Sequence, residues 1–210
     1  QAQYLPARSF DERVAATRAI LATKSKSLTY LYFPELDSIA HSAGAGSIEW
    51  LNKIEELDAA IKNLVSDLSS ESAVLLTADH GIVDVLREQQ TYLDELQVTG
   101  LVAVTGDPRN SFLYFDEGVD VANQQRQLQE QIGDKAIVCT SNDLIKQGWL
   151  GPNVENEDFL PDLFVISQPG TAVYHRDFAK PQSLRMIGQH GGISQAELSV
   201  PLLKFGAYAD

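Results

Sequence analysis

Three of the four histidines lie in short segments whose residue types suit a metal site. His41 closes the segment Asp37-Ser-Ile-Ala-His41, and His80 directly follows Asp79 in Thr-Ala-Asp-His-Gly. His190 is flanked by glycines in Gly-Gln-His-Gly-Gly. Carboxylate oxygens and imidazole nitrogens together are ligands that zinc and related divalent ions take in proteins. Three such segments far apart in the sequence predict one site that the fold assembles.

The spacing within the first two motifs indicates how each could bind an ion. Asp37 and His41 are four positions apart, so on a helical turn their side chains share one face. Asp79 and His80 are adjacent, and on a strand they would point to opposite faces. They converge only if the chain bends after the strand, and Gly81 supplies that freedom. Taken singly, an Asp near a His is more often a hydrogen-bonded pair than a ligand pair.

The spacing of apolar residues predicts the elements that must position these motifs. The predicted helices cover residues 10–23, 47–68, 120–132 and 142–147. The predicted strands cover residues 28–33, 73–78, 98–104, 111–115, 135–139, 163–166, 171–174 and 200–205.

One of these strands indicates where the site should lie. The run at 73–78 is nearly all apolar, which is typical of a strand buried on both faces in a parallel sheet. Asp79 and His80 follow at its carboxyl end, and the first Asp–His pair follows the strand at 28–33 in the same way. In open α/β sheets, ligands bind at this edge. We therefore expect both pairs at one edge of the sheet.

The order of the elements predicts an α/β fold in three parts. Residues 1–83 form the first part of a metal-bearing α/β core, and residues 84–160 form an inserted, cap-like β-β-α-β subdomain. Residues 161–210 add the closing strands of the core and the third metal motif. Within the insert, Gly-Asp-Pro-Arg109-Asn predicts a turn between two strands. Arg109 could meet a substrate phosphate there, but we favour an exposed turn residue.

The composition argues against several functions. Sixteen Lys and Arg against 29 Asp and Glu give a formal net charge of −13, and nonspecific nucleic-acid binding needs a basic face instead. No apolar stretch is long enough to span a membrane, and no signal peptide is visible. The single Cys139 excludes an intrachain disulfide and a cysteine-based zinc cage. This cysteine usage favours a cytoplasmic location.

Taken together, the motifs resemble those of the alkaline phosphatase superfamily, and most closely its type I phosphodiesterase/nucleotide pyrophosphatase branch. Residues 32–41 are similar to the family's Asp-x-x-Gly-His turn, although Ala40 stands where the family usually has glycine. Residues 75–81 are similar to its strand followed by Asp-His-Gly, and residues 188–203 to its closing His-Gly segment and final strand. The order and separations of the motifs also match, over essentially the whole chain.

The resemblance implies a partial alkaline-phosphatase-like sheet with flanking helices, and a hydrolase of phosphodiester or pyrophosphate bonds in small phosphate esters or nucleotides. It also implies two divalent ions, usually zinc. Carried over residue by residue, Asp37, His41 and His190 would hold the first ion, and Asp79 and His80 would contribute to the second. Two ions roughly 4 Å apart can clamp the attacking and leaving oxygens of an in-line phosphoryl displacement.

The family's Thr or Ser nucleophile and one further Asp ligand lie upstream of these motifs, and neither has a match here. Ser9, Asp11 and Thr17 precede the first motif, but none follows a strand end. We therefore expect the chain to be the carboxy-terminal portion of a longer enzyme and to be inactive by itself. Two alternatives remain open: another hydrolase of the superfamily, such as a phosphomonoesterase or a sulfatase, and a noncatalytic metal-binding or partner-binding domain.

Overall fold

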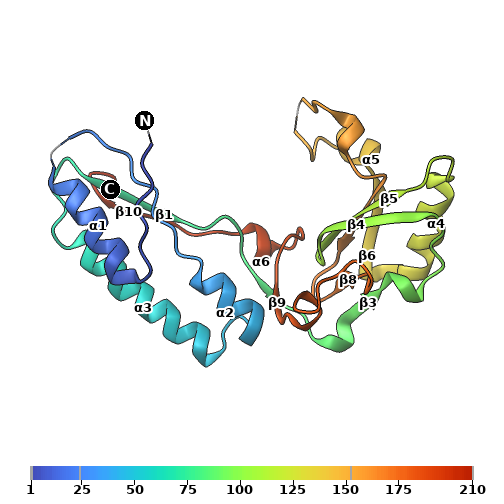
Figure 1. Cartoon of the computed structure of the whole chain (residues 1–210), viewed down its shortest axis with the longest axis horizontal. Helices are drawn as coiled ribbons and strands as arrows, with labels where there is room; N and C mark the ends of the chain where they lie inside the picture. The colour runs from blue at the N-terminus through green and yellow to red at the C-terminus, as the bar shows by residue number, and fades with distance from the viewer. Residues whose placement is uncertain (1, 24, 152, 210) are drawn as a thin grey trace. The chain divides into compact units, whose positions relative to one another are not determined.

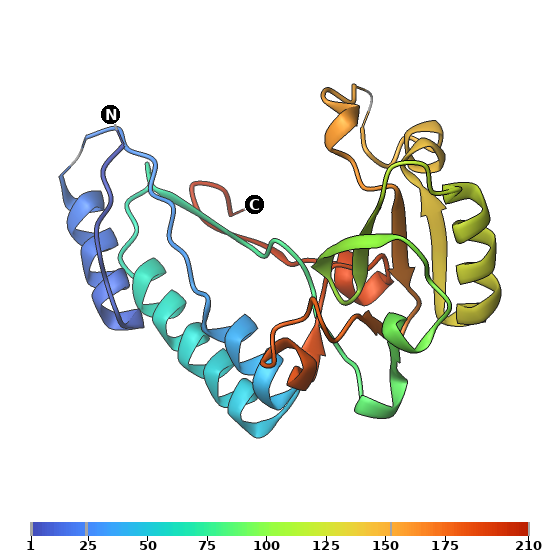
Figure 2. The same cartoon turned by 45° about the vertical axis from the view of Figure 1, so that its right-hand side comes forward.

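The computed structural model describes residues 2–23, 25–151 and 153–209, and the chain folds as two compact units. Unit 1 comprises Gln1–Asp79 together with Val200–Asp210, and unit 2 comprises His80–Ser199. Unit 2 is therefore one continuous segment, whereas unit 1 is built from both ends of the chain. Figures 1 and 2 show the elements of each unit.

In the part of unit 1 that the structure describes, there are three helices and a two-stranded sheet. Helix α3 (Ile48–Val65) packs against both α1 (Phe10–Ala22) and α2 (Glu35–Ala43), and Figure 1 shows α1 and α3 side by side. The sheet pairs β1 (Ala73–Thr77) with β10 (Leu202–Gly206) in antiparallel orientation. Val14, Ala60 and Leu64 form the buried contact between α1 and α3.

Two serines define where the longer helices of unit 1 begin. The Ser9 hydroxyl accepts a hydrogen bond from the Glu12 amide, and the Ser47 hydroxyl accepts one from the Trp50 amide. Each satisfies an amide that has no partner within the helix, as is typical of serine at an N-cap. The helices predicted at 10–23 and 47–68 are thereby confirmed.

The strand predicted at 28–33 is wrong. The structure assigns no strand to these residues, and the Leu28 and Tyr30 side chains are 100% and 87% exposed. An apolar run forms a strand only where neighbouring strands pair with its backbone and cover its side chains. Among the described residues, no strand pairs with this segment.

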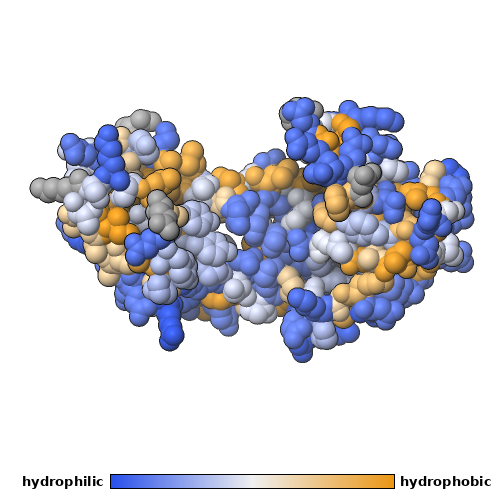
Figure 3. Space-filling model, turned by 45° about the horizontal axis from the view of Figure 1, so that its top comes forward, coloured by the Kyte–Doolittle hydropathy of each residue, from blue (hydrophilic) through white to orange (hydrophobic). Residues whose placement is uncertain are grey.

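The strand predicted at 73–78 is confirmed as β1, but its predicted surroundings are wrong. Within the described residues β1 pairs only with β10, and the pairing is antiparallel, with Leu75 opposite Lys204. A two-stranded ribbon cannot bury both of its faces, so Leu75 is 54% exposed. Figure 3 shows apolar patches at the surface of both units.

Unit 2 is organised around a four-stranded antiparallel sheet with the strand order β4-β5-β7-β6. The strands are β4 (Leu101–Asp107), β5 (Asn110–Phe115), β6 (Ala136–Thr140) and β7 (Leu163–Ser167). Helix α4 (Val121–Ile132) packs along β6, as Figure 2 shows. These elements match the strands and the helix predicted from the sequence.

The largest apolar core lies between α4 and the four-stranded sheet. Each fully buried aliphatic side chain contributes about 1.5–3 kcal/mol to folding, so this cluster is a principal source of stability for unit 2. Its most deeply buried aliphatic members include Leu113, Leu128, Ile132, Val138, Leu163 and Val165.

Short elements complete unit 2. Strand β2 (Val83–Asp84) pairs antiparallel with β9 (Gly188–Gln189), and β3 (Gln90–Tyr92) pairs parallel with β8 (Ala172–Tyr174). Helices α5 and α6 cover Ser141–Lys146 and Gln195–Leu198. Single turns of 3-10 helix cover Arg87–Gln89, Leu93–Glu95, Gly133–Lys135, Glu157–Phe159 and Ser183–Arg185.

Four further expectations concern the fold class, the domain division, Cys139 and membrane-spanning helices. The mixed α/β class is confirmed, whereas the division at 84–160 and 161–210 stays a prediction. Cys139 is buried on β6 as expected, where burial and the nearby Asp143 charge raise the pKa of its thiol to about 11. Among the described residues, no helix is both long and apolar enough to cross a membrane.

A buried ion pair joins distant parts of unit 2. Arg109, at the turn between β4 and β5, donates two hydrogen bonds to the Glu197 carboxylate, at 2.8 and 2.6 Å. The two residues are only 0% and 2% exposed, so the expectation of an exposed Arg109 is wrong. The guanidinium also donates to the main-chain oxygens of Gln168 and Thr171, and these bonds offset its loss of water.

The surroundings of Glu197 favour its ionised form. Burial raises the pKa of this carboxyl group, but hydrogen bonds from Arg109, Ser194 and Gly192 outweigh burial and lower the pKa to about 2. The carboxylate is therefore charged throughout the neutral and mildly acidic range.

We predict that Leu163→Ala destabilises unit 2 by about 2–5 kcal/mol, because it leaves a cavity in the main core. Urea unfolding measures the loss. Ile137→Ala removes the same number of carbon atoms from β6, but Ile137 is 41% exposed and the change should cost less than about 1 kcal/mol. Equal losses in the two variants would contradict this account of the core.

We predict that Glu197 makes the free energy of unfolding depend on pH in the acidic range. Its pKa is about 2 in the folded chain and near the ordinary 4.5 when unfolded. Its contribution is thus complete above pH 5 and disappears as the pH falls towards 2, a difference on the order of 3 kcal/mol. Urea unfolding between pH 5 and 2 should show the free energy of unfolding falling as the pH falls. In the double variant Arg109→Met/Glu197→Gln, the part of this slope that Glu197 contributes should be absent. An identical slope in both proteins would contradict the prediction.

Candidate functional site

The first motif lies on helix α2 of unit 1. Asp37 falls in its first turn, where the helix dipole favours a carboxylate, and His41 falls in its last turn. The Nε2 atom of His41 lies 3.2 Å from Oδ1 of Asp37, as the four-residue spacing predicts. Ala40, which replaces the family's usual glycine, is fully buried, so its methyl group is accommodated by the packing.

The second motif follows strand β1, and its two residues close unit 1 and open unit 2. Asp79 is the last residue of the first segment of unit 1, and His80 is the first residue of unit 2. The His80 Nδ1 atom lies 2.9 Å from the carbonyl oxygen of Gly81. A carbonyl can only accept, so Nδ1 carries the proton and the lone pair of the neutral ring is on Nε2. Main-chain contacts of this kind orient the histidines that bind metals.

The third motif meets the second within unit 2. The rings of His80 and His190 stack with their centroids 3.6 Å apart and their planes 15° from parallel. The stacking brings into direct contact two imidazole rings, a side chain that binds metal ions in its neutral form.

Glu197 contacts the segments that carry both of these histidines. Its main-chain oxygen accepts a 2.7 Å hydrogen bond from the Gly81 amide, which directly follows His80. Its carboxylate accepts a 2.9 Å bond from the Gly192 amide, two residues after His190. One residue of helix α6 thus connects the second and third motifs.

Glycine is required where these segments meet Glu197 and its neighbours. A Cβ atom on Gly81 would lie 1.9 Å from the main-chain oxygen of Ala196. A Cβ atom on Gly192 would lie 2.8 Å from the Arg109 guanidinium and 2.9 Å from the Glu197 carboxylate. Gly81 and Gly192 therefore permit close packing of these segments against Glu197 and its neighbours.

The structure thus forms two pairs from the predicted ligands, Asp37 with His41 in unit 1 and His80 with His190 in unit 2. A single centre made from all the predicted residues stays a prediction.

Glu197 was not predicted as a functional residue, and the exposed position predicted for Arg109 is wrong. A signal for Glu197 was visible, because Ser194-x-x-Glu197 is a capping-box pattern. For Arg109, the turn composition pointed to solvent, and no local signal indicated a partner 88 positions away.

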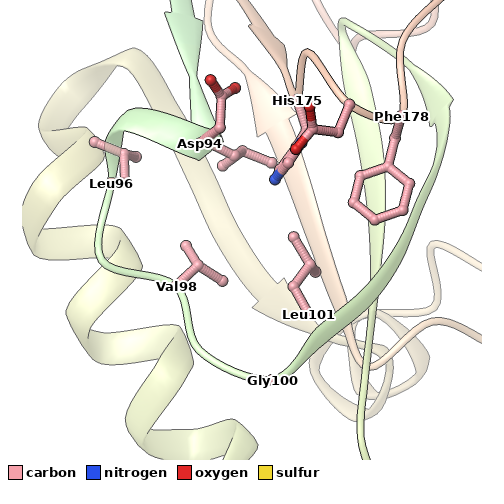
Figure 4. Close-up of a pocket in the computed structure, with 9 residues that line it drawn as sticks. Asp94, Leu96, Val98, Gly100, Leu101, His175 and Phe178 are labelled. Atoms are coloured by element: carbon pink, nitrogen blue, oxygen red, sulfur yellow. The ribbon is translucent and has the colours of Figure 1, made fainter.

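A separate hollow of about 440 Å³ lies beside β4 in unit 2 (Figure 4). Beside it, His175 packs edge-to-face against Phe178, with ring centroids 4.8 Å apart. No residue of the three motifs lines this hollow, so it is distinct from the histidine pairs. Its lining includes Asp94, Leu96, Val98, Leu101, His175 and Phe178.

Comparisons with known proteins agree with the motifs. The type I phosphodiesterase / nucleotide pyrophosphatase family model matches residues 2–193. The chain is similar to human ectonucleotide pyrophosphatase / phosphodiesterase 5, with 18% identity and a TM-score of 0.79 over 98% of this chain and 54% of that one. Two structures of the murine protein, one an inactive variant in complex with AMP, each give 19% identity and a TM-score of 0.77. They cover 97% of this chain and 55% and 54% of theirs.

These comparisons show the fold and the family. The chain spans about half the length of the solved structures that it matches. No curated protein matches it by sequence. The family model covers most of the chain, and the structures share its α/β fold. The chain belongs to the type I phosphodiesterase / nucleotide pyrophosphatase family.

Proposed function

We propose that the chain supplies five ligands of a two-metal centre that hydrolyses phosphodiester or pyrophosphate bonds. The observation that carries this proposal is the stacking of His80 on His190, which brings together two motif residues from opposite ends of unit 2. Family membership supports the reaction class.

The donor atoms fit divalent zinc. We assign Asp37, His41 and His190 to the first ion, and Asp79 and His80 to the second, following the family resemblance. The Asp37–His41 pair offers one oxygen and one nitrogen a single helical turn apart. The ligands are imidazoles and carboxylates, which zinc readily takes, and none is a thiolate. When bound, two such ions would stabilise the charge on phosphate oxygens and lower the pKa of a coordinated nucleophile.

The ligand residues also determine the charge of the centre. Two carboxylates, Asp37 and Asp79, do not fully neutralise two divalent ions, and neutral histidines add no charge. The loaded site would therefore be positive within a chain of net charge −13, and it would attract a phosphate group locally. We assign no nucleophile within this chain, and we propose that by itself it turns substrate over slowly or not at all.

We propose nucleotide diesters or pyrophosphates as the substrate class. One support is the murine structure in complex with AMP, which belongs to a protein of the same fold. The stacked histidines give no preference between a diester and a monoester, so the class rests on the family and needs a direct comparison of rates.

We predict that His190→Ala in the intact protein removes about one bound zinc. The variant should also lower zinc affinity by more than the roughly 100-fold typical of losing a hydrogen-bond partner of a metal ligand. Elemental analysis and competition with a chromogenic chelator measure both quantities. His175→Ala is the matched control, because His175 belongs to none of the three motifs. Unchanged zinc content in His190→Ala would show that the ligand assignment is wrong.

We also predict that the zinc-loaded intact protein hydrolyses bis(p-nitrophenyl) phosphate faster than p-nitrophenyl phosphate or p-nitrophenyl sulfate. The comparison of kcat/KM uses one leaving group throughout, so it reports on the group transferred. Faster hydrolysis of the monoester would favour a phosphomonoesterase, and faster hydrolysis of the sulfate ester a sulfatase. Zinc binding without hydrolysis of any of the three would favour a noncatalytic domain.

A further inference from the structure

We propose that Arg109 is a positioning residue which, through Glu197, holds the two histidine-bearing segments of unit 2 against each other. The part of this inference that concerns metal rests on the proposed function. The part that concerns the histidine rings stands on the contacts within unit 2 and can be tested without metal.

The carboxylate of Glu197 is the point at which these contacts meet. Both of its oxygens bond to Arg109, from the Nε and Nη2 atoms. The same oxygens accept hydrogen bonds from the Gly192 amide and from the amide and hydroxyl of Ser194. The loop that follows His190 is therefore wrapped around one buried carboxylate.

The main chain of Glu197 completes the connection. Its carbonyl oxygen accepts the Gly81 amide at 2.7 Å, so the side chain holds the loop after His190 while the backbone holds the residue after His80. A shift of Glu197 would move both segments. The 3.6 Å stacking of the two rings is the arrangement that these bonds support.

Arg109 links Glu197 to the four-stranded sheet. It lies at the turn between β4 and β5, and its Nη1 donates to the main-chain oxygens of Gln168 and Thr171, between β7 and β8. The guanidinium is thus held by the four-stranded sheet on one side and by the carboxylate on the other. Its planar fork makes all these bonds at once, which a lysine ammonium cannot reproduce.

The close fit at Gly192 indicates that the ion pair shapes the loop. A Cβ atom there would stand 2.8 Å from Nη2 of Arg109 and 2.9 Å from both carboxylate oxygens of Glu197. The loop backbone lies directly on the ion pair, with no room for a side chain between them. Loss of the guanidinium would therefore remove a charge and also a group against which the loop backbone packs.

The test compares three variants of the intact protein by NMR of the histidine ring protons, first without metal. A proton that lies over a neighbouring aromatic ring resonates upfield. The ring protons of His80 and His190 should therefore be shifted upfield while the two rings are stacked. Arg109→Met should abolish the upfield shift, and Arg109→Lys should retain part of it. Arg176→Met is the control, because Arg176 pairs with Asp94 and Glu95 at the surface.

The same variants are then titrated with zinc. We expect Arg109→Met to bind zinc about 10–100-fold more weakly, as is typical when an outer contact of a ligand is lost. Arg176→Met should bind as the unchanged protein does. In the active enzyme, the loss should fall on kcat rather than KM, because the altered residue touches no substrate.

Unchanged ring shifts in a folded Arg109→Met protein would overturn the inference and leave Arg109 a purely stabilising role. If that variant does not fold, Arg109→Lys and Gly192→Ala replace it, and unchanged shifts in both would overturn the inference equally. If the unchanged protein binds no zinc, the proposed function fails, while the metal-free ring shifts still decide whether Arg109 positions the histidines.

Discussion

The buried ion pair between Arg109 and Glu197 is the interaction on which the geometry of unit 2 depends. Removing a guanidinium and a carboxylate from water is costly, and hydrophobic replacements of such pairs are often as stable. Its value here is geometric. Bonds that offset the desolvation also tie the β7–β8 connection and the segment after His190 to the ion pair, and the main-chain oxygen of Glu197 adds the segment after His80.

This geometry connects the segments that carry His80 and His190, the two proposed metal ligands within unit 2. A metal-binding imidazole must present one nitrogen in a defined direction and keep its other nitrogen occupied. His80 meets the second requirement through the Gly81 carbonyl, and the amide of the same glycine is held by Glu197. The ring and the backbone beside it are thus oriented by adjacent hydrogen bonds, as the proposed role of His80 as a metal ligand requires.

Unit 1 illustrates a different constraint, the dependence of strands on their neighbours. Helices satisfy most of their backbone groups internally, and α1 and α3 form where periodicity and a serine N-cap predict, whereas α2 was not among the predicted helices. A strand must find its hydrogen bonds on another segment. The residues at 28–33 have the composition of a strand yet remain unpaired in the part of the chain that the structure describes, and β1 has a single neighbour.

The sequence by itself determined four of the helices (α1, α3, α4 and α5), most of the strands, the Asp37–His41 spacing and the family, because each depends on local periodicity or on a short ordered motif. Only the tertiary structure decided that Leu75 faces solvent, that Arg109 is buried, and that His80 stacks on His190. These are contacts between segments far apart in the sequence. Turn composition predicts exposure for an arginine because most turns meet water, and it holds no information about a carboxylate that the fold brings to it from 88 positions away.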